Sequence, residues 1–261
     1  MKPSRPIVLC FSGHDPSGGA GIQADIEAII SHNCHPASII TVLTEQNSRN
    51  VKKLIPQKPE DILSQAENLL SDFNIDAIKI GLIGHHETAL AISQILQQYP
   101  DIPVVLDPVL AAGGGTDLAG EQLIKTIIEK LLPMTTLLTP NSLEARRLSG
   151  FEDLQECGLN LQARGAEYVL ITGTHEDSEQ VNNRLFMPDA LNETFTWSRL
   201  PHSYHGSGCT LASACAALIA QGLDVFTAVN EAQDYTWHAL AAAYKPGQGQ
   251  HSPNRLFWMD A

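Results

Sequence analysis

Basic residues are scarce in this chain of 261 residues. It carries 16 lysines and arginines against 29 aspartates and glutamates, for a formal net charge of −13. Nonspecific binding to nucleic acid or to an anionic membrane requires concentrated positive charge, and the sequence has no local basic patch. The composition therefore excludes a nucleic-acid partner and a membrane-surface partner. An acidic protein can still bind phosphates through backbone dipoles and Mg²⁺.

Long apolar runs and paired cysteines are also missing. Residues 7–11 form an apolar run that is too short for a signal-peptide core, and residues 211–220 are far short of a membrane span. The cysteine count is odd, the spacing is scattered and no C-x-x-C pair occurs, which excludes a disulfide framework and a zinc site. A reduced, cytoplasmic protein fits this pattern. The cysteines are Cys10, Cys34, Cys157, Cys209 and Cys215.

What the sequence does contain is an alternation of short apolar runs and longer helical patterns. This order predicts an α/β fold with three layers, a mainly parallel central sheet between helices on both faces. The expected strands are residues 7–11, 38–42, 77–80, 104–106, 136–139 and 168–172. The expected helices are residues 21–32, 59–72, 87–99, 119–131, 142–148, 210–221 and 225–244.

Two stretches interrupt the alternation. Residues 51–56 could form an extended edge or lid, and residues 184–187 and 194–197 could form a hairpin whose turn lies near residues 188–190. No linker or repeat divides the chain, so we expect one domain over residues 1–261. Residues 245–261 are rich in glycine, glutamine and proline and are predicted to be a loose tail.

The strongest functional signal is the glycine-rich stretch Gly206-Ser207-Gly208-Cys209, which runs directly into a helix of small residues. The free N–H groups of a helix start and the positive end of its dipole form an anion site. The same position should lower the pKa of Cys209. An anion cradle beside a candidate proton acceptor predicts phosphoryl transfer to a hydroxyl group.

Two carboxylates follow predicted strands and are candidates for holding Mg²⁺. Asp107 ends one strand and Glu144 follows another, at the edge of the sheet where parallel strands present their carboxyl ends. Glu144 could alternatively be a first-turn carboxylate that complements a helix dipole. Because the two carboxylates occur together with the predicted anion site, we favour the interpretation that they hold a metal ion.

Other motifs favour different functions less strongly. Residues 19–24 match the dinucleotide fingerprint G-x-G-x-x-A, and Glu45 lies near the distance of a ribose-binding acid, but residues 12–18 separate the fingerprint from its strand. A classical P-loop and the G-x-S-x-G elbow of serine hydrolases are absent. His85 and His86 are adjacent before Glu87, which predicts a helix start instead of a metal cluster.

Six stretches together resemble the hydroxymethylpyrimidine/phosphomethylpyrimidine kinases of thiamin synthesis, members of the ribokinase-like superfamily. The resemblance spans about residues 6 to 245, and the matching stretches occur in the family's order. A cysteine in the last stretch, where wider relatives carry aspartate, is typical of the pyrimidine kinases and of pyridoxal-kinase-like enzymes. The stretches are residues 13–25, 43–48, 79–82, 107–109, 139–144 and 205–210.

The resemblance implies an ATP- and Mg²⁺-dependent kinase that phosphorylates hydroxymethylpyrimidine and then its monophosphate, as a cytoplasmic homodimer. It implies that Cys209 is the base within an anion hole of Gly206, Ser207 and Gly208, and that Asp107 and Glu144 organise Mg²⁺. The implied pyrimidine site consists of Gly13, Asp25, Gln46, Leu82 and Val109. The implied ATP and phosphate site consists of Asn141, Thr172, His205 and Thr210.

Three positions depart from the family pattern. Thr172 stands where the family usually has a lysine that helps neutralise ATP phosphates, Tyr204 replaces a threonine and Leu82 replaces a methionine. The lost cation leaves open whether the chain is a full kinase or a pyrimidine-binding homologue with weak activity. A pyridoxal-type vitamin kinase and a dinucleotide-binding oxidoreductase remain as alternatives.

Overall fold

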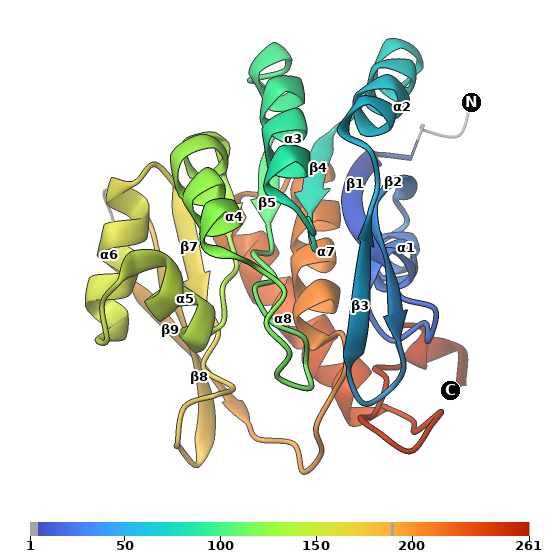
Figure 1. Cartoon of the computed structure of the whole chain (residues 1–261). Coiled ribbons are helices and arrows are strands. Elements are labelled where there is room, and N and C mark those ends of the chain that lie inside the picture. The colour runs from blue at the N-terminus through green and yellow to red at the C-terminus, as the bar shows by residue number, and fades with distance from the viewer. Residues whose placement is uncertain (1–4, 189–190, 261) are drawn as a thin grey trace.

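A single mixed sheet runs through the computed structural model, which describes residues 5–188 and 191–260 (Figure 1). The strand order is β3-β2-β1-β4-β5-β6-β7-β8-β9. Strands β2, β1, β4, β5, β6 and β7 are parallel, whereas β3, β8 and β9 are antiparallel to their neighbours. The strands are β1 (Ile7–His14), β2 (His35–Gln46), β3 (Val51–Pro56), β4 (Ala77–Ile80), β5 (Val104–Leu106), β6 (Leu137–Leu138), β7 (Tyr168–Ile171), β8 (Gln180–Phe186) and β9 (Glu193–Ser198).

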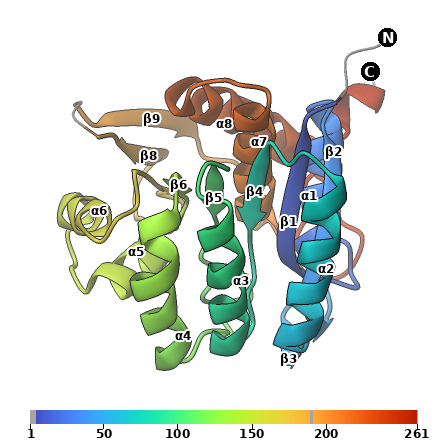
Figure 2. The ribbon, with the colours of Figure 1, turned by 90° about the horizontal axis from the view of Figure 1, so that it is seen from above.

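Helices cover both faces of this sheet (Figure 2). Helices α1, α7 and α8 pack on one face, and α2 to α6 pack on the other. The α-helices are α1 (Gly21–Ser31), α2 (Pro59–Asp72), α3 (His86–Gln98), α4 (Glu121–Thr126), α5 (Ser142–Ser149), α6 (Leu154–Ala163), α7 (Ser207–Ala220) and α8 (Val225–Ala241). A π-helical turn (Ile127–Leu131) and a 3-10 turn (Leu132–Met134) extend α4, and a further 3-10 turn covers Phe257–Asp260.

The apolar strands explain the layered arrangement. In β1, Leu9 and Phe11 are buried under one helix layer, while Val8 and Cys10 are buried under the other. A strand that is covered on both faces needs apolar residues at every position, which is why the sequence shows continuous apolar runs. The predicted three-layer α/β fold is confirmed.

The predicted elements occur near their expected bounds, and the expected hairpin forms as β8 and β9. Its predicted turn includes residues 189–190, which lie outside the described residues. Helix α6 was not predicted. Asp153 caps it by accepting hydrogen bonds from the backbone N–H groups of Gln155 and Glu156, while Leu154 and Leu161 are buried. Only part of one short face is apolar, so its periodicity is weak.

The C-terminal segment corrects the prediction of a loose tail. Ser252 forms a β-bridge with Tyr244, His251 forms another with Tyr204, and the Arg255 side chain is only 1% exposed. The segment has no helical or strand periodicity of its own. Its order comes from hydrogen bonds to distant parts of the chain, which composition does not reveal.

None of the helices in the described part of the chain is long and apolar enough to traverse a membrane. All five cysteines are free thiols.

Candidate active site

The glycine-rich stretch forms an exposed helix start. Gly206 precedes α7 with φ 85°, a left-handed conformation that favours glycine, and no side chain caps the helix. The N–H groups of Ser207, Gly208 and Cys209 belong to the first turn and have no partner within the helix. The positive end of the helix dipole adds to their attraction for an anion. The local geometry is that of the predicted anion cradle.

Thr210 does not extend this cradle, contrary to its predicted role in phosphate binding. Its side chain is fully buried, and its backbone N–H donates to Gly206 O at 3.0 Å. Its hydroxyl also donates to Gly206 O, at 2.7 Å, and accepts from Arg255 Nε at 2.8 Å. Since these groups are all engaged, Thr210 shapes the turn and leaves no polar group free for a phosphate.

The Cys209 thiol has a different character from the one predicted. Burial raises the pKa of Cys209 to about 12, and the charges of Asp107 and Asp25 add to the rise, while the Lys79 ammonium opposes it. The predicted lowering by the helix start is therefore wrong. The Cys209 thiol interacts with the Asp107 carboxylate, whose pKa it lowers, and the Gly21 backbone opposes the rise in the pKa of the thiol. Cys209 is thus protonated at neutral pH and connected to a carboxylate.

Asp107 and Glu144 lie together at the carboxyl edge of the sheet, as expected. Among the described residues, buried Asp107 Oδ2 has no hydrogen-bond partner. Burial raises the pKa of Asp107 to about 6 against the opposing charge of Lys79. Burial and the charge of Asp107 together raise the pKa of Glu144 to about 8. Two buried carboxylates that destabilise each other's charge, one with an unused oxygen, fit a hard divalent cation.

Glu144 also has the structural role considered from the sequence. Asn141 caps α5 by accepting from the Glu144 N–H at 3.0 Å, and Glu144 Oε2 accepts from the Asn141 N–H at 2.9 Å. Glu144 Oε1 accepts from the Leu110 N–H at 3.2 Å. This capping box fixes the carboxylate beside Asp107. A β-bridge between Asn141 and Thr172 places the predicted ATP-binding residue Thr172 beside the same turn.

Asp25 lies behind the site instead of lining it. Its carboxylate is fully buried and accepts hydrogen bonds from Lys79 Nζ at 2.8 Å, from Ser213 Oγ at 2.7 Å and from Ser12 Oγ. These three donors occupy both oxygens, so this geometry does not support the predicted direct contact with a pyrimidine. Asp25 instead joins α1 and α7 to β1 and β4 beneath Cys209.

The other predicted pyrimidine ligands gather at the ends of β1, β2, β4 and β5. A Cβ at Gly13 would lie 2.9 Å from Leu82 Cδ2, so these two residues meet closely. Gln46 is half-buried at the end of β2, and Val109 is half-buried after β5. The polar part of this group is Gln46, because the others offer only backbone or apolar surface.

His205 connects the cradle to the loop that precedes α1. Its Nε2 lies 2.8 Å from Asp15 Oδ2, which also accepts from the Ala20 N–H at 2.8 Å. Asp15 Oδ1 accepts from the N–H and the hydroxyl of Ser17. Although burial raises the pKa of Asp15, the hydrogen bonds from His205 and Ser17 outweigh it and lower the pKa to about 2.

Replacing Asp15 by asparagine is expected to destabilise the protein by about 2 kcal/mol at pH 7. A lowered carboxyl pKa stabilises the fold above its unfolded value of about 4, and this stabilisation disappears as the pH falls through about 2. Chemical unfolding between pH 2 and pH 7 measures the difference, which should shrink on acidification. Asp117→Asn, which removes an exposed partner of Arg147, should cost less than about 1 kcal/mol. An equal cost for both variants would contradict the prediction.

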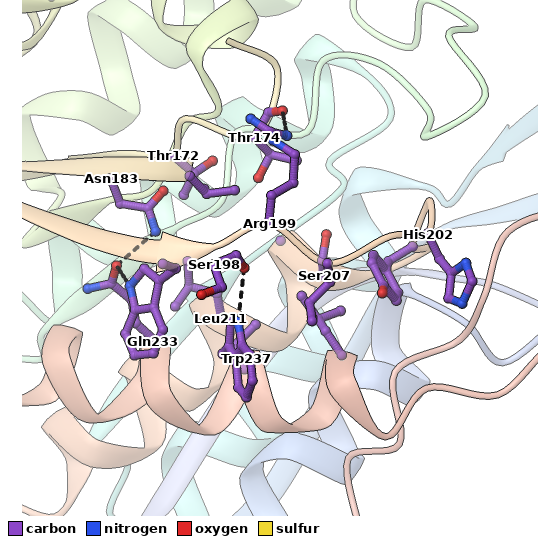
Figure 3. A pocket seen from close by; sticks show the side chains of 17 residues that line it. Thr172, Thr174, Asn183, Ser198, Arg199, His202, Ser207, Leu211, Gln233 and Trp237 are labelled. Atoms are coloured by element: carbon purple, nitrogen blue, oxygen red, sulfur yellow. Dashed lines mark hydrogen bonds between the residues drawn. The ribbon is translucent and has the colours of Figure 1, made fainter. Parts of the chain in front are cut away.

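A cavity of about 270 Å³ opens beside the cradle, between the β8–β9 hairpin, α8 and the start of α7 (Figure 3). Ser207 and Gly208 of the cradle line the cavity, and so does Thr172. The indole rings of Trp197 and Trp237 lie along its wall. The cavity therefore joins an aromatic surface to an anion site.

Hydrogen bonds hold the cavity wall in place. Gln233 Oε1 accepts from Asn183 Nδ2 at 2.8 Å and from Trp197 Nε1 at 3.1 Å, and Trp237 Nε1 donates to Ser198 O at 3.1 Å. Arg199 extends to the loop after β7 and donates to the backbone oxygens of Thr174, Glu176 and Ser178. These bonds fix the positions of both indole rings in the wall.

Several of these residues were not predicted. Asp15 lies within residues 13–25, one of the stretches that carry the family resemblance, but only the fold shows that its carboxylate caps this loop. Lys79 carried a usable signal, since a lysine inside the apolar strand β4 indicates a buried charge that needs a partner. The sequence gives no signal for Arg199 or Arg255, because their hydrogen-bond partners are backbone oxygens and side chains that are distant in the chain.

The chain was compared with families of known proteins. A family model described as phosphomethylpyrimidine kinase matches residues 15–254. The hydroxymethylpyrimidine/phosphomethylpyrimidine kinase of Escherichia coli is 36% identical over 246 residues, which cover 92% of each protein. A thiamine biosynthesis bifunctional protein of Geobacter sulfurreducens is 35% identical over 97% of this chain, which spans 52% of that longer protein.

Solved structures give the same grouping. The ADP complex of Bacillus subtilis pyridoxal kinase superimposes with a TM-score of 0.89 at 27% identity, over 97% of this chain and 98% of that one. The phosphomethylpyrimidine kinase of Clostridium difficile superimposes with a TM-score of 0.80 at 29% identity, over 90% of this chain and 100% of that one.

Proposed function

The chain belongs to the phosphomethylpyrimidine kinase family, and on this premise we propose that it is an ATP- and Mg²⁺-dependent kinase of thiamin biosynthesis. It phosphorylates 4-amino-5-hydroxymethyl-2-methylpyrimidine and then the resulting monophosphate. The observation that carries this proposal is the cavity that ends at the uncapped start of α7 beside Asp107. A phosphoryl donor, its acceptor and a cation can meet at that point.

The cavity fits a nucleoside triphosphate. The base lies against the aromatic wall of Trp197 and Trp237, and the phosphates extend toward Ser207 and Gly208. The amides of the first turn of α7 hold the transferred group, because they are oriented before the reaction and the helix dipole favours negative charge. Thr172 and Asn141 lie beside this path.

Asp107 and Glu144 would hold Mg²⁺, since both carboxylates are buried side by side and Asp107 Oδ2 has no hydrogen-bond partner among the described residues. The bound ion would neutralise charge that develops on the phosphates. The capping box at α5 keeps Glu144 from turning away, so the two carboxylates are positioned before the ion arrives.

The pyrimidine binds against Gly13, Leu82 and Val109, with Gln46 as the hydrogen-bonding group. Gln46 has both an amide donor and an acceptor, which match the paired donor and acceptor of an aminopyrimidine edge. Asp25 supports this site from behind by holding α7 against the sheet through Ser213.

Cys209 handles the proton of the hydroxymethyl group. In a loose transition state the hydroxyl proton leaves late, so a weak acceptor suffices. As the sulfur takes that proton, its own proton would pass to the neighbouring Asp107 carboxylate, with which the thiol interacts. The thiol is therefore a relay whose high pKa keeps it protonated between turnovers.

An ADP-release assay with Mg²⁺-ATP tests the proposed function directly. Hydroxymethylpyrimidine and its monophosphate should each stimulate ADP formation, and the products should carry one and two phosphates by mass spectrometry. Binding of the pyrimidine without ADP formation would contradict the kinase activity.

Restoring the missing cation should improve the use of ATP. Thr172→Lys adds an ammonium to the cavity that Ser207 and Gly208 also line, and we expect KM for ATP to fall by about tenfold. Thr174→Lys adds the same charge elsewhere on the cavity wall and is the matched control. The prediction fails if Thr172→Lys leaves KM unchanged or if both variants lower it equally.

A pyridoxal-type vitamin kinase is a second candidate, because the pyridoxal kinase of Bacillus subtilis shares the fold at a TM-score of 0.89. The two functions differ in the acceptor, so kcat/KM for pyridoxal against hydroxymethylpyrimidine separates them. We favour the pyrimidine, since the E. coli relative at 36% identity carries that name. We further propose that the protein is cytoplasmic and forms a homodimer with one kinase domain in each copy. Analytical ultracentrifugation tests the oligomeric state.

A further inference from the structure

Arg255, which follows the second proline of the C-terminal segment, is buried although it carries a full charge. Its side chain is 1% exposed, and arginine is rarely found at this depth unless it is paired. The guanidinium contacts three separate parts of the chain. Nε donates to Thr210 Oγ1 at 2.8 Å, Nη1 pairs with Glu27 Oε2 at 2.9 Å, and Nη2 donates to Gly19 O.

Two of these contacts belong to the two halves of the active site. Gly19 lies in the loop that connects α1 to β1, the strand that carries Gly13 of the predicted pyrimidine site, and Thr210 lies in the first turns of α7. The Thr210 hydroxyl, which accepts from Arg255, in turn donates a hydrogen bond to Gly206 O at 2.7 Å. A continuous chain of hydrogen bonds therefore joins Gly19, Arg255, Thr210 and Gly206.

The junction is tightly packed. A Cβ at Gly206 would lie 2.0 Å from Gly19 O and 2.8 Å from Arg255 Nη2, and a Cβ at Gly19 would lie 2.3 Å from His205 Cδ2. The loop and the cradle thus touch backbone to backbone. The guanidinium donates to the loop at Gly19 O and is connected to the Gly206 turn through Thr210.

The guanidinium itself is held firmly. The Arg255 carbonyl accepts hydrogen bonds from Ser31 Oγ at 2.8 Å and from Tyr235 Oη at 2.9 Å, which fix the backbone between α1 and α8. The C-terminal segment before it is fixed by the bridge between Tyr244 and Ser252. A rigid backbone gives the side chain a defined origin from which to position its partners.

We propose that Arg255 is a positioning residue for phosphoryl transfer, which holds the Gly19 loop and the Gly206 turn at the separation that brings acceptor and phosphate together. The proposal rests on the proposed kinase function. Phosphoryl transfer depends almost entirely on positioning and charge stabilisation, so a displacement of about 1 Å can cost about a hundredfold in rate.

Arg255→Lys provides the first test. One ammonium cannot reproduce the planar fork that serves Gly19, Thr210 and Glu27, so kcat should fall by about 10- to 100-fold. KM for ATP should change by less than about threefold, because Trp197 and Trp237 hold the nucleotide elsewhere. A drop confined to KM would overturn the proposal.

Glu27→Gln is the matched control. It removes the charged partner of Arg255 and leaves the acceptors at Gly19 and Thr210 in place. Glutamine keeps a side-chain oxygen that can accept from Arg255 Nη1, so the buried guanidinium retains a hydrogen-bond partner there. We expect kcat to stay within about twofold of the wild type. If Glu27→Gln lowered kcat as much as Arg255→Lys does, the rate would depend on the ion pair between Arg255 and Glu27. The proposal that Arg255 acts by positioning the two loops would then be wrong.

The Thr210 hydroxyl tests the connection independently of Arg255 and remains informative if Arg255→Lys fails to fold. Thr210→Val removes the hydroxyl at nearly constant volume and should lower kcat, while Thr210→Ser keeps it and should restore the rate. In the double variant with Arg255→Lys, the losses should be clearly less than additive, since both act on one chain of hydrogen bonds. Fully additive losses would contradict the proposal.

Hydrogen exchange separates this proposal from the proposed function. Amides of residues 18–22 and 206–210 should exchange about tenfold faster in Arg255→Lys, and those of α3 should exchange at the wild-type rate. If the wild type released no ADP with either substrate, the proposed function would fail, but the exchange comparison would still decide whether Arg255 connects the loops. Unchanged exchange in both segments would overturn the proposal.

Discussion

Replacing Cys209 by alanine is expected to slow phosphorylation of hydroxymethylpyrimidine by about a hundredfold or more, while phosphorylation of the monophosphate stays within a few fold of the wild type. The two steps differ in their nucleophile. The first uses a hydroxyl group that must lose its proton to the relay of Cys209 and Asp107. The second uses a phosphate that is already ionised at neutral pH and needs no acceptor.

Single-turnover measurements with each substrate at saturating Mg²⁺-ATP would show this asymmetry. Cys215→Ala is the matched control, since it removes a buried thiol from the same helix away from its N-terminus. It should leave both steps nearly unchanged. Equal losses in both steps for Cys209→Ala would instead assign the thiol to shaping the cradle.

Gly206→Ala is expected to destabilise the protein by about 3 kcal/mol and to remove nearly all activity. The backbone at Gly206 has φ 85°, which costs a residue with a side chain about 1 kcal/mol. The new Cβ would also lie 2.0 Å from Gly19 O, and neither backbone can move without opening the cradle. Stability and rate should therefore fall together.

Gly208→Ala separates the two effects. Its Cβ would meet only the Asp107 carboxylate oxygens, at 3.9 Å, so Tm should stay at the wild-type value. The methyl group nevertheless projects toward the proposed Mg²⁺ ligand, and we expect the rate of ADP release to fall by about tenfold. Thermal unfolding and ADP release on both variants provide the comparison. A wild-type Tm for Gly206→Ala would show that the turn is not constrained as described.

Much of the fold follows from local patterns. Apolar runs over β1, β4 and β5 specify strands that are buried on both faces, and helical patterns between them specify parallel crossovers. Helix α6 could not be predicted, because its ten residues have one weak apolar face and therefore little helical periodicity. The order of the C-terminal segment could not be predicted either, because it depends on partners such as Tyr204 and Thr210 that are distant in the chain.

The candidate site also has one part that could be predicted from the sequence and another that only the fold reveals. The cradle of Gly206, Ser207 and Gly208 and the carboxylates Asp107 and Glu144 could be predicted, because each follows from a helix start or a strand end. The fold corrected the roles of Asp25 and Thr210, whose polar groups are already occupied by buried neighbours. Sequence position fixes which element carries a side chain but not what fills the space around it.

The sequence by itself determined that a glycine-rich turn with free N–H groups begins α7 and that Asp107 and Glu144 follow neighbouring strands, because backbone hydrogen bonding and strand direction are local properties. Only the tertiary structure decided that Cys209 stays protonated, that Lys79 is paired with Asp25, and that Arg255 joins the two loops of the site. These outcomes depend on burial and on charges brought together from distant positions. Desolvation and Coulomb energies are set by distances in the folded chain, which no local pattern encodes.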